Sequence, residues 1–145
     1  MDVRADVEVS RPASEVFEYL ADAQNMPRWM KAFTAVEKLG DGPIGPGTEF
    51  RYLDRRGTDS TFEWSVYRPA SELAWHGARV KAMPGGSFEP EGYYELHEHH
   101  GQTHVEMHMK PRLRGTAKLF APFLSRSMRK ANGEYMSRLK DDLER

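Results

Sequence analysis

The chain has 145 residues, no cysteine and a formal net charge of −1. This length suits one domain, residues 1–145, whose core can stand without disulfides or a metal. The lack of cysteine excludes disulfides and thiolate zinc sites, and the small net charge provides no global attraction to nucleic acid or anionic membrane. No apolar run has transmembrane length and none follows Met1, so we expect a cytoplasmic protein without a secretory signal.

The first third of the chain predicts a strand, two short helices and another strand. Residues 3–9 alternate between apolar and polar side chains, which is typical of a strand. Apolar residues at helical spacing then predict a helix that ends near Ala21, and a second short helix follows at 25–30. The period-2 pattern returns at 33–39, before a turn rich in glycine and proline at 40–47.

The middle of the chain predicts five more strands. Their expected ranges are 48–54, 60–68, 71–79, 87–97 and 102–110. Short turn segments join them, which favours an antiparallel meander.

Alternate positions of these strands carry large apolar side chains. The set is Phe50, Tyr52, Phe62, Trp64, Val66, Leu73, Trp75, Tyr94, Leu96, Val105, Met107 and Met109. The positions between them are mostly charged or polar. This split predicts a sheet with one dry face and one wet face, and it assigns nearly every titratable group to the wet face.

The last third predicts a long amphipathic helix. From about Leu113 to Leu143 the apolar residues step by three or four. Pro122 should either kink this helix or mark its true start. Only this element is long enough to cover the dry face of the sheet. The expected fold is therefore α+β, in which a curved antiparallel seven-stranded sheet wraps around the C-terminal helix, with two short helices after the first strand.

Several stretches resemble the SRPBCC superfamily, also called START-like or helix-grip proteins, in its polyketide cyclase/dehydrase-like branch. The matching stretches are Val9–Phe17, Met26–Trp29, Gly42–Thr48, Trp64–Val66 with Pro69 and Leu73, and Leu139–Glu144. The resemblance covers essentially the whole chain and implies a deep cavity between the sheet and the long helix. It does not define the function, because one fold supports many functions.

Large apolar and aromatic residues are the candidate lining of that cavity. They are Trp29, Phe33, Phe50, Tyr52, Phe62, Trp64, Trp75, Tyr94, Met107, Met109, Phe120, Leu124 and Met128. The alternative is that these side chains interdigitate as a solid core, which the sequence does not separate from a cavity.

Three functions therefore stay open. The first is a carrier or binding protein for a small hydrophobic ligand, lipid-like or aromatic and polyketide-like. The second is a polyketide cyclase or dehydratase that folds a flexible substrate in a shaped cavity, with Tyr52, Tyr94 and His76 as the first residues to replace. The third is an interaction module whose cavity is closed. No residue is marked as catalytic by a motif.

The titratable residues point outward by parity. His104 and His108 are four residues apart on one strand, about 13 Å, so they cannot share a metal ion, whereas His97 and His104 could do so in the right register. Glu89, Glu91 and Glu95 could pair with Arg51 for acid/base work only if a bulge near Pro90 turned them inward. We expect no metal and no cofactor.

The polar face of the last helix is basic but interrupted. Its cations are Lys118, Arg126, Arg129, Lys130, Arg138 and Lys140, and its acids are Glu134, Asp141, Asp142 and Glu144. Nucleic acid or membrane would bind to an uninterrupted stripe, whereas this mixture favours a solvated face. The expected partner is a small hydrophobic molecule, with no nucleic acid, no stable membrane insertion, and a monomer or homodimer.

Overall fold

The computed structural model describes residues 1–145. As predicted, it begins with a strand and two short helices, continues with a run of strands and ends with a long helix. The main strands are β1 (Val3–Val9), β2 (Phe33–Lys38), β3 (Glu49–Asp54), β4 (Asp59–Arg68), β5 (Glu72–Gly77), β8 (Glu91–His99) and β9 (Gln102–Met109). Three shorter strands are β6 (Val80–Met83), β7 (Gly86–Glu89) and β10 (Arg112–Gly115). The helices are α1 (Ala13–Ala21), η1 (Ala23–Asn25), α2 (Met26–Trp29), η2 (Thr116–Phe120) and α3 (Ala121–Leu143).

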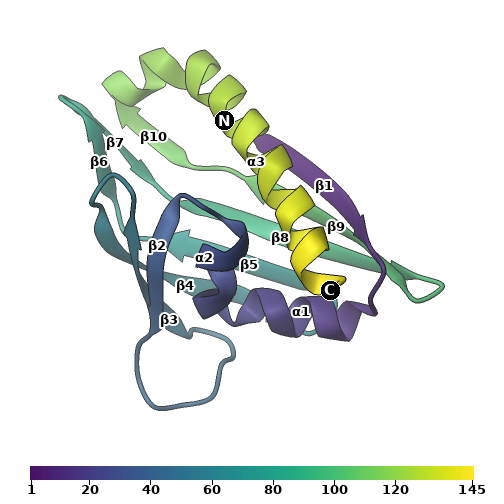
Figure 1. The fold of residues 1–145 in the computed structure, drawn as a ribbon. Coiled ribbons are helices and arrows are strands. Elements are labelled where there is room, and N and C mark those ends of the chain that lie inside the picture. Colours follow the sequence, from purple (N-terminus) through teal and green to yellow (C-terminus); the bar gives the residue numbers. More distant parts are fainter.

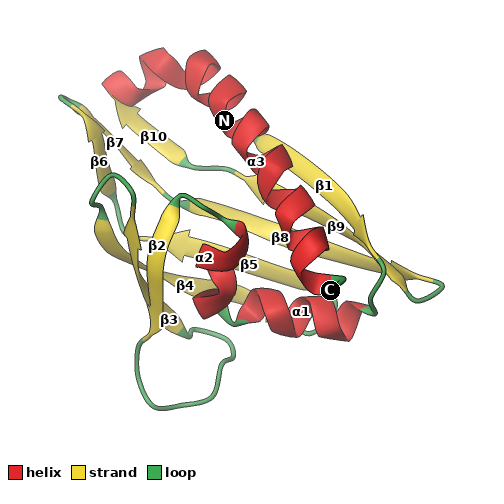
Figure 2. Cartoon of the chain, in the orientation of Figure 1, coloured by secondary structure: helices red, strands yellow, loops and turns green.

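The seven longer strands form one antiparallel sheet in the order β1-β9-β8-β5-β4-β3-β2. The sheet curls, and α3 lies across its concave face (Figure 1). The two short helices α1 and α2 cover the part of the same face that α3 leaves open (Figure 2). This arrangement confirms the helix-grip fold, with its seven-stranded sheet and long C-terminal helix.

The dry face of the sheet is the core of the protein. Phe50, Leu73, Val105 and Met107 are fully buried, as the period-2 pattern predicts. The helices α1 and α2 add further apolar side chains, and the indole Nε1 of Trp64 donates a 3.0 Å hydrogen bond to the Ala21 carbonyl at the end of α1. A buried tryptophan thereby keeps its N–H satisfied.

One inward position of the predicted pattern is wrong. The pairing of β4 with β5 shifts between Trp64 and Val66, which is a β-bulge. A bulge inserts a residue and reverses the faces beyond it. Tyr67 instead of Val66 therefore packs against the core, where its ring meets Phe17 of α1 at 5.0 Å, edge to face.

The second sheet was not predicted. The expected strand 71–79 ends at Gly77, and β6 begins at Val80 in another sheet. The expected strand 87–97 is broken at Pro90 into β7 and β8, because proline has no N–H to donate to a ladder. Strands β6, β7 and β10 form a three-stranded sheet in the order β10-β7-β6 beside the first.

The long helix begins later than about residue 113. Leu113 and Ala117 fit a helical period, but residues 112–115 pair with β7 as β10. Gly115 ends this strand with a φ of 63°, and a Cβ there would overlap the carbonyl oxygen of Gly85. Pro122 lies in the first turn of α3, so it marks the true start of the helix, which was one of the two predicted alternatives.

Candidate functional site

The site is a cavity of about 330 Å³ between the concave face of the main sheet, the three-stranded sheet and α3. Hydrophobic residues make up 17 of the 23 that line it. The volume falls in the range of small-molecule sites, roughly 300–1,000 Å³. Sheet and helix thus leave a gap and do not meet as a solid core.

Nine of the residues predicted for the lining do line this cavity. They are Phe33, Tyr52, Phe62, Trp64, Trp75, Tyr94, Met109, Leu124 and Met128. They come from β2, β3, β4, β5, β8, β9 and α3, so residues far apart in sequence meet at one place.

Four predicted residues are not part of the lining. Trp29, Phe50 and Met107 are buried in the core around the cavity, with exposed fractions of 1%, 0% and 0%. Phe120 is 50% exposed, and its placement in the cavity was wrong. The helical spacing that placed it inward does not apply, because Phe120 belongs to the tighter η2 turn before α3 starts.

The sequence pattern missed a wall of the cavity. Ala82, Met83 and Phe88 come from the three-stranded sheet, and Leu113 comes from its third strand. Met26 is the first residue of α2, and Met30 directly follows its last residue. The methionines flank Trp29 in the sequence and could have been proposed, whereas the four-residue strands carry no clear alternation of their own.

Two tyrosines place phenol groups in the lining. Tyr94 is 3% exposed and its ring lies 5.0 Å from that of Trp75 and 6.3 Å from that of Trp29. Burial raises the pKa of Tyr94, and burial together with the nearby Asp54 raises the pKa of Tyr52. Both phenols therefore stay protonated near neutral pH and offer O–H donors.

Three charged residues also line the cavity. Asp54 accepts hydrogen bonds from the backbone N–H groups of Arg56 and Thr58, each 2.9 Å, so its carboxylate holds the β3–β4 turn. Glu91 accepts a 2.8 Å hydrogen bond from Nε of Arg112. The exposed Arg56 is in no ion pair of the structure and leaves a guanidinium at the cavity edge.

The proposed acid/base groups of the strands lie elsewhere. His76 is outside the lining, and its Nε2 lies 3.5 Å from Glu89. Hydrogen bonds from Arg79 and His76 lower the pKa of Glu89, so it stays ionised. Arg51 pairs with Asp59 at 2.6 Å. Among the candidate carboxylates only Glu91, which follows the break at Pro90, reaches the cavity.

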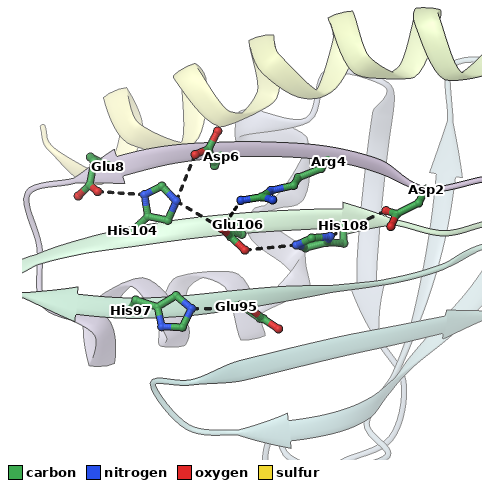
Figure 3. Close-up of polar contacts among 9 residues, drawn as sticks. All are labelled: Asp2, Arg4, Asp6, Glu8, Glu95, His97, His104, Glu106 and His108. Atoms are coloured by element: carbon green, nitrogen blue, oxygen red, sulfur yellow. Dashed lines mark hydrogen bonds and ion pairs between the residues drawn. The ribbon is translucent and has the colours of Figure 1, made fainter.

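His104 and His108 join acidic residues and Arg4 in a polar network on the outer face of β1 and β9, and His97 contacts only Glu95 on β8 beside it (Figure 3). His97 and His104 are paired across β8 and β9, but His104 contacts Glu8 at 2.9 Å and Asp6 at 3.1 Å instead. Burial would raise the pKa of Glu106, but hydrogen bonding from His108 and nearby positive charges lower it. No group of three or more histidine or acidic residues is arranged to hold a metal ion.

A family model and a curated relative both match most of this chain. The sequence model for "Polyketide cyclase / dehydrase and lipid transport" matches residues 1–144. An uncharacterised protein of Mycobacterium tuberculosis is 26% identical over 131 residues, which is 88% of this chain and 77% of the relative.

None of the helices here is long and apolar enough to cross a membrane.

Solved structures share the fold at low identity. The di-domain aromatase/cyclase BexL superposes with a TM-score of 0.76 at 18% identity, over 99% of this chain and 46% of BexL. The ZhuI aromatase/cyclase of a Streptomyces species gives 0.70 at 18% identity, over 100% and 94%. A conserved protein of Geobacillus kaustophilus gives 0.77 at 12% identity, over 99% and 95%. With the fold, the cavity and the match over residues 1–144 taken together, this chain belongs to the polyketide cyclase/dehydrase and lipid transport family.

Proposed function

We propose that this protein binds a small hydrophobic molecule, lipid-like or aromatic and polyketide-like, in the cavity beneath α3. The observation that carries the proposal is an apolar cavity of about 330 Å³ with few polar groups. Apolar ligands gain free energy by leaving water, roughly 25 cal/mol per Å² of buried area.

The polar groups suggest how the ligand would be oriented. The phenols of Tyr52 and Tyr94 offer donors, so a ligand with a carbonyl or ether oxygen would be favoured over a pure hydrocarbon. Arg56 at the edge would favour an anionic group on the outer end of the same ligand.

The test is native mass spectrometry combined with thermal shift against a library of fatty acids and polycyclic aromatics. Ala82 lines the cavity, so Ala82→Trp should fill part of it and abolish the shift. Ala78→Trp places the same ring at an exposed position outside the lining and should preserve it. If the purified protein carries nothing and no library member raises its melting temperature, the proposal fails.

A cyclase or dehydratase is the second candidate. Two of the superposed structures are aromatase/cyclases, and the cavity here has donors that could hold a flexible carbonyl chain in one fold. Tyr52→Phe and Tyr94→Phe remove only the hydroxyls. A loss of turnover of a polyketide-like substrate in both variants, with binding retained, would favour this function. Unchanged turnover would remove the two tyrosines as catalysts.

A further inference from the structure

The start of α3 carries an exposed apolar cluster. Leu119 is 78% exposed, Phe123 is 71% exposed and Phe120 is 50% exposed. The other exposed large apolar side chains, Leu39 and Leu53, are less exposed, at 38% and 42%, and lie far along the chain from this group. Three neighbouring side chains of this size and exposure mark an interaction surface and are not ordinary scatter.

The same segment is purely cationic. Residues 112–133 include no acidic residue, and their cations are Arg112, Arg114, Lys118, Arg126, Arg129 and Lys130. Arg112 and Arg114 pair with Glu91 and Glu89. The other four are in no ion pair of the structure, so their charge is free for a partner. We call Leu119, Phe120 and Phe123 with these four cations the tip surface.

The geometry of α3 separates the tip surface from the cavity. Leu124 and Met128 line the cavity, one turn apart on the inner face. Arg126 and Lys130 follow Phe123 by three and seven residues, which puts them on the face of Phe123. The first half of α3 thus has an apolar inner face for the cavity and an apolar and basic outer face with no protein covering it.

The tip surface also adjoins a groove beside the cavity. A shallow groove of about 850 Å³ runs between the N-terminus, β10 and the start of α3, and Lys110 and Lys118 line it. Leu113 and Pro111 line both this groove and the cavity, so the groove adjoins the cavity. Figure 1 shows β10 and the first turns of α3 together at one end of the molecule, away from the C-terminus.

We propose that the tip surface docks on an anionic lipid bilayer, with Leu119, Phe120 and Phe123 in the headgroup layer and the four free cations on acidic lipid headgroups. An apolar and basic helix start of this kind matches an interface between hydrocarbon and negative charge. Leu119, Phe120 and Phe123 line neither the cavity nor the groove, which favours a flat bilayer surface over the side chains of an acidic protein. A role in exchanging ligand with the bilayer rests on the proposed function, whereas docking itself does not.

The test is co-sedimentation of the ligand-free full chain with vesicles. Vesicles of phosphatidylcholine with phosphatidylglycerol should bind the protein, pure phosphatidylcholine should not, and salt should weaken binding. The variant Leu119→Ser with Phe123→Ser should abolish sedimentation. Leu53→Ser, at another exposed site, should leave it unchanged. Melting temperatures identify any variant that fails to fold, and Phe123→Ser alone then replaces the double variant.

A variant without three of the cations measures the electrostatic contribution to vesicle binding. Arg126→Gln, Arg129→Gln and Lys130→Gln together should weaken binding on the order of 100-fold. Lys38→Gln, Arg55→Gln and Arg138→Gln remove the same charge away from the start of α3 and should have little effect. Equal losses in both triple variants, or no binding to either kind of vesicle, would overturn the proposal. Binding to a polyaspartate column without binding to vesicles would assign the surface to an acidic protein and also overturn it.

The two proposals fail independently. If the protein binds vesicles but no hydrophobic molecule binds in the cavity beneath α3, the ligand-binding proposal fails and the docking proposal stands. A ligand that binds the cavity while Leu119 and Phe123 variants sediment like the wild type would remove the docking surface alone.

Discussion

The two halves of α3 differ in nearly every physical respect. In the second half Asn132, Tyr135, Met136 and Leu139 are buried, whereas no residue of the first half, 121–131, is buried. Polar contacts follow the same division. Asp142 accepts hydrogen bonds from Tyr19 and Arg28, Lys140 donates to the Glu8 carbonyl at 2.8 Å, and no side-chain hydrogen bond or ion pair involves residues 121–131.

The second half of α3 therefore serves mainly to stabilise the fold, whereas the first half is available for binding. The second half of α3 closes the core against β1 and α2, and Asp142 bonds to Tyr19 of α1. The first half spans a cavity and presents the tip surface, so it contributes little packing energy. Segments with few buried contacts open at lower free-energy cost than the core. We therefore expect the first half to be the part of the helix that moves when a ligand enters.

The largest expected effect compares two leucines of the same helix. Leu139 is fully buried, and Leu139→Ala should lower the free energy of unfolding by about 2–5 kcal/mol. Leu124 already faces a gap, and Leu124→Ala should cost about 1 kcal/mol or less. Urea denaturation measures both. Similar losses would show that the two halves are packed alike and would break the comparison.

A second prediction concerns Gly92, which lies next to Trp75 of the cavity lining. It lies opposite Trp75 in the β5–β8 pairing, and a Cβ there would overlap both the Trp75 ring and the His108 carbonyl. Gly92→Ala should lower stability by about 1–3 kcal/mol and displace Trp75 toward the cavity. Tryptophan fluorescence and ligand titration check this. A variant with normal stability and affinity would contradict the tight approach.

Gly133 lies where the two halves of α3 meet. It is exposed, and a Cβ at this position would contact nothing within 4 Å. Gly133→Ala should raise the free energy of unfolding by about 0.5–1 kcal/mol, because alanine favours helix. Slower ligand exchange in this variant would show that the glycine lets the first half move. If the variant is stabilised but exchanges ligand at the same rate, Gly133 is not the point about which the first half moves.

The smallest expected effect is the pH dependence of stability at the C-terminal end of α3. Hydrogen bonds from Lys140 and the Ser10 backbone lower the pKa of Glu144 below its ordinary 4.5. A depressed carboxyl pKa stabilises the folded state above pH 4.5, and this contribution is lost as the pH falls through the folded-state pKa. Glu144→Gln should therefore melt lower than the wild type at pH 7, with the gap closing in acid.

The exposed Glu18 provides the control for Glu144, because it makes no ion pair in the structure. Glu18→Gln should melt like the wild type at both pH values. A gap between Glu144→Gln and the wild type that stays constant from pH 7 into acid would show that the contact of Glu144 is not ionic.

The candidate site was predictable where its residues sit on long, regular elements. Tyr52, Trp64 and Tyr94 line the cavity because strand side chains alternate between faces, a property that the local sequence carries. Phe88 and Met83 were missed because they belong to four-residue strands with too few positions to show a period. Val66 was misplaced because a bulge depends on the partner strand.

By itself, then, the sequence determined the order of the main elements, the dry face of the large sheet and the long C-terminal helix, because periods of 2 and 3.6 residues are local properties. Only the tertiary structure decided that β6, β7 and β10 pair into a second sheet and that a gap remains under α3. It also decided that Phe120 points away from that gap. Pairing and cavity volume depend on segments distant in the chain, and no local pattern reports the space between them.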